Sequence, residues 1–120
     1  MRLYVPTTLA DLRTALAQAP VPAEALIDGR GDTVVPEGED EEQEYDALMT
    51  AADASQERLA GPGRRVVVVA EVPAGTDPDA PVALRDVVAL HADDADRGPD
   101  ADPDDELSWY ATQELDDLLS

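Results

Sequence analysis

The single histidine of the chain, His91, is the side chain best suited to proton transfer or metal binding near neutral pH. Asp93 follows two positions later, and such residues project from the same face of a strand. The pair is a candidate for an oriented general base or for two ligands of a metal ion. A third ligand would have to come from elsewhere, with Glu44 and Glu114 as candidates. Because two ligands do not make a site, a strand-end histidine stabilised by a neighbouring acid is the simpler interpretation.

Other reactive groups are scarce. The chain has no cysteine, which excludes disulfides, thiolate nucleophiles and cysteine-ligated zinc or iron–sulfur sites. The acids after Asp93 suggest a calcium loop, but a loop that starts at Asp94 has Pro99 at its sixth position, and one that starts at Asp100 has Ala111 at its twelfth. An EF-hand needs glycine and glutamate at those positions. We therefore expect no cofactor and assign no catalytic residue.

Acidic residues dominate the charge of the protein. The 120 residues include 28 Asp and Glu against 8 arginines and no lysine, for a formal net charge of -20. Seven of the ten residues over 37–46 are acidic, as are eight of the fourteen over 93–106. Such a field repels nucleic acid and anionic membranes and attracts basic proteins, so a basic protein is the expected partner. Helix starts that favour acids, and an ordinary solvated face, explain part of this density.

Hydrophobic spacing in the first half of the chain predicts a strand followed by two helices. The strand covers 2–5 and ends at Pro6, because proline cannot donate to a ladder. Thr8 is the expected N-cap of the first helix. The second helix is expected from about 39 to 60, with an apolar stripe that includes Tyr45.

The second half of the chain predicts two further strands and a last helix. The β-branched run over 66–70 is typical of a strand buried on both faces. The segment 87–91 is expected to be the last strand, and an acidic, flexible linker over about 93–105 follows it. The final helix is expected over about 104–119.

These elements predict one α/β domain over residues 1–120. In the order β-α-(β)-α-β-β-α, a small mixed sheet of three to four strands would be covered by three helices. No stretch approaches the roughly 20 apolar residues of a membrane span. The N-terminus lacks the apolar core of a signal peptide, so we expect a cytoplasmic protein.

The only tryptophan, Trp109, falls within the predicted last helix. At about 100° per residue, that helix collects its leucines on one side. Trp109 falls on the other side with Gln113 and Asp116, and Tyr110 lies at the border of the leucine face. Two interpretations stay open. Trp109 is either covered, with the 93–105 linker as a candidate cover, or exposed as the anchor of a protein interface, where tryptophan is enriched.

Four short motifs, spread over nearly the whole chain, resemble an uncharacterised family of small acidic proteins from high-GC Gram-positive bacteria. In chain order the motifs are Arg2-Leu3-Tyr4-Val5-Pro6-x-Thr8-Leu9, Glu44-Tyr45-x-x-Leu48, His91-x-Asp93-Asp94 and Leu107-x-Trp109-Tyr110-Ala111-Thr112-Gln113-Glu114-Leu115. The last motif is the most specific of the four. The resemblance implies a shared fold and does not imply a mechanism.

The sequence favours a non-enzymatic interaction or regulatory module that binds a basic protein. Trp109 would anchor the partner, and the acidic start of the second helix would steer it. The residues assigned to this surface are Trp109, Tyr110, Gln113, Asp116, Glu39, Glu42 and Glu44. One alternative is a small metal-dependent or general-base enzyme that uses His91 and nearby carboxylates. Another is a nucleic-acid mimic whose carboxylates imitate phosphates. The oligomeric state stays open.

Overall fold

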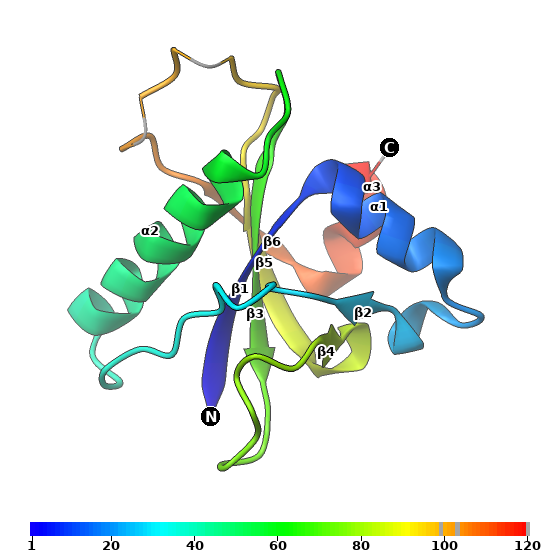
Figure 1. Cartoon of the computed structure of the whole chain (residues 1–120), viewed down its shortest axis with the longest axis vertical. Helices are drawn as coiled ribbons and strands as arrows, with labels where there is room; N and C mark the ends of the chain where they lie inside the picture. The colour runs from blue at the N-terminus through cyan, green and yellow to red at the C-terminus, as the bar shows by residue number, and fades with distance from the viewer. Residues whose placement is uncertain (99, 103, 120) are drawn as a thin grey trace.

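A four-stranded sheet divides the molecule into two sides (Figure 1). The computed structural model of the chain describes residues 1–98, 100–102 and 104–119. Its strands and helices are, in chain order, β1 (Arg2–Thr8), α1 (Leu9–Gln18), β2 (Leu26–Ile27), α2 (Glu41–Glu57), β3 (Arg65–Glu71), β4 (Val82–Ala83), β5 (Val87–Ala92), β6 (Ser108–Ala111) and α3 (Leu115–Leu119). The strand order in the main sheet is β1-β3-β5-β6, and β2 pairs with β4 in a separate two-stranded sheet.

The α/β class, a sheet of four strands and three helices agree with the fold expected from the sequence, and that prediction is confirmed. One detail differs, because the sequence predicts a mixed sheet and all the described strand pairs are antiparallel. None of the described helices combines the length and the hydrophobicity that a membrane span requires.

Strand β3 lies in the interior of the sheet, between β1 and β5. Its valines are at most 4% exposed, which confirms the predicted strand buried on both faces. Successive side chains alternate between the two faces. Val66 and Val68 belong to one hydrophobic core, and Val67 and Val69 belong to the other.

The face of the sheet with Val66 and Val68, which we call the covered face, lies under α1, α3 and the β2–β4 sheet (Figure 1). Helix α1 begins where the sequence predicts, because the Thr8 hydroxyl accepts the Asp11 N–H at 3.2 Å. The buried residues on this face are Leu3, Val5, Leu9, Leu12, Ala25, Ile27, Val66, Val68, Ala70, Val72, Val82, Leu84, Val87, Leu90, Ala92, Leu115 and Leu118.

On the opposite face, α2 packs on β1 and β3 and covers only that part of the sheet. We call this side the open face. The helix runs from Glu41 to Glu57, shorter than the expected 39–60, and Asp40 is its N-cap. Its buried positions are Ala47, Ala51, Ala52 and Ser55. Small side chains let the helix approach the valines of the sheet, so the predicted stripe is wrong at Tyr45, which is 47% exposed.

Strand β1 continues to Thr8 rather than ending at Pro6. The Tyr4 N–H donates to the Val34 carbonyl at 2.9 Å, on the side away from β3. Pro6 lies two residues further along, so its nitrogen points to the same outer side, where β3 needs no donor. A proline is tolerated in β1 because β1 is an edge strand of the main sheet.

The predicted last helix over 104–119 is wrong in its first half. The segment Ser108–Ala111 is strand β6, paired antiparallel with β5, and α3 begins only at Leu115. Strand β5 is consequently not the last strand. Aromatic residues favour strands. Pairing with β5 provides the backbone hydrogen bonds that a helix would otherwise provide. The leucine spacing that predicts a helix belongs to α3 alone.

The predicted linker over 93–105 includes Pro99 and Pro103, which lie outside the described residues, as does Ser120. Within it, Asp93 and Arg97 are both 8% exposed. The backbone of Arg97 exchanges two hydrogen bonds with Gly63, at 2.9 and 3.2 Å. This part of the segment is therefore tied to the start of β3.

Candidate functional site

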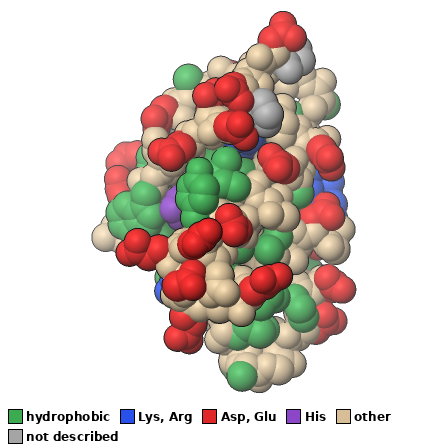
Figure 2. Space-filling view, turned by 90° about the vertical axis from the view of Figure 1, so that its left-hand side faces the viewer, with side chains coloured by type: hydrophobic (Ala, Val, Ile, Leu, Met, Phe, Trp, Pro, Cys, Tyr) green, Lys and Arg blue, Asp and Glu red, His purple; other side chains and the backbone are tan. Residues whose placement is uncertain are grey.

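A groove of about 490 Å³ lies on the open face, between α2 and the β5–β6 strands. Figure 2 shows this side of the molecule, with hydrophobic side chains gathered beside the histidine and acidic side chains around them. The groove is lined by Arg2, Tyr4, Glu41, Glu44, Tyr45, Leu48, Val69, Val88, Ala89, His91 and Trp109. It exists because α2 covers β1 and β3, while the outer strands on the same face have no helix above them.

Trp109 lies on β6 opposite His91 of β5 and is 60% exposed. Of the two interpretations open from the sequence, exposure is therefore the observed one. The helical projection that suggested it is wrong, because Trp109 lies on a strand. In a strand, neighbouring side chains alternate between faces, so Tyr110 packs against the core of the covered face. Trp109 and Tyr110 consequently belong to two different surfaces.

Helix α2 supplies the other wall of the groove through Glu41, Glu44, Tyr45 and Leu48. These positions have the spacing i, i+3, i+4 and i+7, which places them on one stripe of a helix. Tyr45 and Leu48 face the groove because the alanines of α2 occupy the side that touches the sheet. The wall therefore joins apolar side chains to two carboxylates.

Two ion pairs hold the guanidinium group of Arg2, which lines the groove. Arg2 donates to Glu44 at 2.8 Å and to Glu71 at 2.7 Å. The hydrogen bond to Glu71 is the main cause that raises the pKa of Arg2. Both ion pairs use the single positive charge of Arg2, and the carboxylates around the groove outnumber that charge. The site is therefore electronegative.

His91 lies between Trp109 and the middle of the sheet, and it is half-buried. Burial lowers the pKa of its imidazole below the ordinary value of 6.5, so His91 is neutral at physiological pH. It is a polar, uncharged neighbour for Trp109 under those conditions. A cross-strand pair of this kind brings two side chains within contact distance on one face.

Asp93 is committed to arginines rather than to a ligand. Its carboxylate accepts from the Arg65 backbone at 2.8 Å and from the Arg65 guanidinium at 2.9 and 3.1 Å. Arg97 approaches it at 3.5 Å. Among the residues that the structure describes, no three histidine, aspartate or glutamate side chains are placed to hold a metal ion. Within the part of the chain that the structure describes, the His91–Asp93 pair therefore has neither a free carboxylate nor a third ligand.

The other residues assigned from the sequence are dispersed. Glu44 lines the groove, while Glu39 lines a neighbouring hollow with Arg2. Glu42 is exposed near the start of α2. Gln113 and Asp116 are exposed beyond the end of β6, and neither lines the groove. Of the assigned acids, Glu44 therefore lines the groove with Trp109, whereas Gln113 and Asp116 of the expected polar rim do not.

Sequence reasoning missed Tyr45 and Val88, which are 47% and 46% exposed in the groove. The sequence places Tyr45 on a buried stripe, since its spacing from Leu48 fits one. Val88 is turned out by an irregularity in the pairing of β3 and β5, where Val69 pairs with Ala89 and Ala70 pairs with Val87. Nothing in the run of valines at this point indicates such a bulge.

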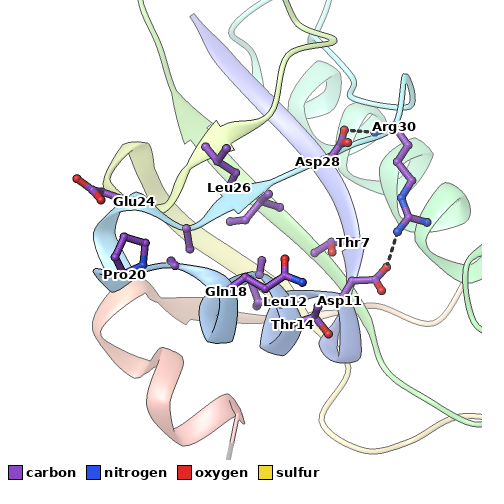
Figure 3. A pocket seen from close by; sticks show the side chains of 14 residues that line it. Thr7, Asp11, Leu12, Thr14, Gln18, Pro20, Glu24, Leu26, Asp28 and Arg30 are labelled. Atoms are coloured by element: carbon purple, nitrogen blue, oxygen red, sulfur yellow. Dashed lines mark hydrogen bonds and ion pairs between the residues drawn. The ribbon is translucent and has the colours of Figure 1, made fainter.

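A second hollow of about 460 Å³ lies between α1 and β2 (Figure 3). Arg30 approaches Asp11 at 3.5 Å, and its backbone N–H donates to Asp28 at 2.8 Å. Two of the carboxylates around this hollow are therefore engaged with Arg30. Leu12 and Ile27 provide apolar wall that belongs to the covered core. The exposed aromatic side chains of the open face make the groove the better candidate site.

The fold and the groove define a small acidic α/β protein with one face of its sheet partly open. The chain belongs to a family of unknown function (DUF6912), whose model matches residues 1–119. The resemblance to an uncharacterised family is confirmed at this level. No curated protein and no solved structure matches the chain.

Proposed function

We propose that the protein is a non-enzymatic cytoplasmic module of high-GC Gram-positive bacteria that binds a basic segment of a partner protein. The segment binds at the groove between α2 and β6, against the side chain of Trp109. Trp109 is its anchor, with Tyr45 and Val88 as the apolar surround. Glu41 and Glu44 contact or attract its basic side chains.

The observation that carries this proposal is the exposure of three large hydrophobic side chains in one groove. Trp109, Tyr45 and Val88 are 60%, 47% and 46% exposed, and all three line it. Apolar patches rimmed by polar residues are typical of protein interaction sites. Tryptophan and tyrosine are also the residues most enriched among those that dominate binding energy.

Charge determines which partner fits. The net charge of -20 disfavours acidic ligands, and the two glutamates on α2 place negative charge beside the apolar side chains. Electrostatic attraction of this kind accelerates association and weakens as salt rises. The screening length falls from about 10 Å at 0.1 M salt to about 3 Å at 1 M.

Neither alternative gains support from the site. An enzyme based on His91 would need Asp93 or another carboxylate as its partner, and Asp93 is held by Arg65. A nucleic-acid mimic would need carboxylates in the middle of its binding face. On the open face, the centre is hydrophobic and the acids surround it (Figure 2).

The test uses the intrinsic fluorescence of Trp109, because it is the only tryptophan of the chain. A short peptide of alternating lysine and valine is titrated into the protein, and an otherwise identical glutamate–valine peptide is the control. We expect the basic peptide alone to shift the emission to shorter wavelength. Raising the salt from about 0.1 M to about 1 M should weaken binding, since screening becomes nearly complete.

A matched pair of variants separates the groove from general surface hydrophobicity. Leu26 on β2 is as exposed as Trp109, at 60%, and lies outside the groove. Trp109→Ala should abolish binding of a fluorescently labelled peptide, while Leu26→Ala should bind as the wild type does. Equal binding by wild type and Trp109→Ala would show that the groove is not the site.

A further inference from the structure

The outer edge of β6 turns backbone groups of Trp109 away from the sheet. The Asp93 N–H donates to the Arg65 carbonyl at 3.2 Å, so His91, two residues earlier, turns its backbone toward β3. His91 and Trp109 are therefore a non-hydrogen-bonded pair, and the N–H and C=O of Trp109 point away from β5. Ala111 agrees with this geometry, because its N–H donates outward to the Glu114 carboxylate at 3.0 Å.

The other edge of the sheet is closed. On β1, the outer N–H and C=O of Tyr4 both bond to Val34 at 2.9 Å. Pro6 offers no N–H, and its carbonyl accepts from Arg58 at 2.5 Å. Natural sheets protect their edges with such devices, because a free edge is a template for pairing with another chain. Among the described residues, no comparable segment is paired to the outside of β6.

We propose that the basic partner segment binds in extended form, as an additional antiparallel or parallel strand along the outer edge of β6. This inference rests on the proposed function and specifies the conformation of the ligand. The added strand lies on the side of β6 away from β5, and its side chains on the open face contact Trp109 at the border of the groove. The Trp109 N–H and C=O supply main-chain hydrogen bonds to the added strand, and the Ala111 N–H supplies another when the ligand displaces the Glu114 carboxylate. Binding by strand addition draws affinity from such bonds and specificity from alternate side chains.

The side chains on the two faces of β6 specify an alternating ligand. On the open face, Trp109 lies beside the added strand and favours apolar residues. On the opposite face, Ser108 and Tyr110 both donate to the Asp94 carboxylate at 2.7 Å. These two bonds, with that from Tyr110 the larger cause, hold the pKa of Asp94 below its ordinary value, so it stays charged. Basic residues are therefore favoured on that face.

Charge also decides between a foreign segment and a second copy of this chain. Two copies that paired through β6 would bring together chains of net charge -20 each, and each β6 carries the Asp94 carboxylate on its Ser108 and Tyr110 side chains. Like charges across an interface are unfavourable. A basic segment meets the same edge with complementary charge.

Hydrogen exchange of individual amides tests the geometry directly. In the free protein, the Trp109 amide should exchange faster than those of Ser108 and Tyr110, which face β5. Saturation with the alternating lysine–valine peptide should slow exchange at Trp109. Peptide binding without protection of the Trp109 amide would overturn strand addition and leave the proposed function intact.

A substitution at the edge provides the second test. Ala111 has φ of -71°, which suits proline, and its N–H is outside the ladder to β5. Ala111→Pro leaves the Trp109 side chain in place and obstructs the edge. The matched control is Glu114→Ala, which loses the same cap bond but keeps the Ala111 N–H free to pair.

Affinity for the lysine–valine peptide then separates the hypotheses. Strand addition predicts roughly tenfold weaker binding by Ala111→Pro, the effect of about one backbone hydrogen bond, and unweakened binding by Glu114→Ala. Wild-type affinity in Ala111→Pro with loss in Trp109→Ala would overturn strand addition while supporting the groove. No binding by the wild type at low salt would overturn both proposals.

Discussion

The two faces of the sheet bury their residues by different means. The covered face packs leucines and valines of the sheet against α1, α3 and the β2–β4 sheet. The open face packs alanines of α2 on β1 and β3 and leaves the strands beyond them with partly exposed side chains. The first arrangement is an ordinary apolar core. The second is a smaller core that ends in a groove.

Buried polar groups complete the open side. Ser55 of α2 is fully buried; its hydroxyl donates to the Thr7 carbonyl and accepts the Val66 N–H at 3.1 Å. Asp93 and Arg65 close the end of β3 and β5 with a buried ion pair. Such bonds are directional, so they position α2 and the strand ends without filling space above β5 and β6. Stability and the proposed binding surface thus belong to different parts of one sheet.

The largest expected effect comes from Asp93. Asp93→Ala leaves the fully buried Arg65 without the carboxylate that pairs with it. Removing one partner of a buried ion pair costs about 3–5 kcal/mol. The measurement is the free energy of unfolding in urea, with Asp96→Ala as the control, because Asp96 is an exposed partner of Arg64. A loss no larger than in the control would show that the polar cluster does not hold the sheet together.

A pair of substitutions on β5 compares the two faces directly. Leu90→Ala removes a fully buried side chain of the covered face and should cost about 2–5 kcal/mol. Val88→Ala, two residues earlier and 46% exposed, should change stability by no more than about 0.5 kcal/mol. Urea unfolding of both variants checks the difference. Similar losses at the two positions would contradict the assignment of Val88 to an open surface.

The sequence predicts best what depends on short-range physics. The valine run of β3 and the Thr8 cap of α1 were both predictable, because continuous β-branched residues and an N-terminal hydroxyl have one favoured structural outcome. The α/β class follows from the same kind of signal. Acidity was likewise evident, but it indicates a partner class without indicating where on the surface the partner binds.

The site depended on contacts that the sequence does not encode locally. When the leucine spacing of α3 is extended toward the N-terminus, it predicts a helix where β6 lies. The segment forms a strand because it pairs with β5. Tyr45 fits a buried stripe, yet the sheet selects the alanine side of α2. Trp109 is exposed, but on a strand opposite His91 rather than on a helix beside Gln113. Tertiary pairing decided each of these outcomes.

The smallest expected effect is a dependence of stability on pH that arises on the open face, at His91. Burial lowers its pKa in the folded protein, whereas the unfolded chain titrates near the ordinary value of 6.5. Below that value the unfolded state binds a proton more readily than the folded state. Stability contributed by the neutral imidazole is therefore present above about pH 6.5 and is lost as the pH falls toward the folded pKa.

Comparison with His91→Gln isolates this contribution, because all other titrating groups are common to both proteins. Between about pH 7.5 and pH 5.5, the wild type should lose more free energy of unfolding than the variant does. The proton resonance of the His91 ring should titrate with a midpoint below 6.5. Parallel stability curves would mean that the imidazole is as well solvated in the groove as in the unfolded chain. Water would then reach further toward the middle of the sheet than the burial of His91 indicates.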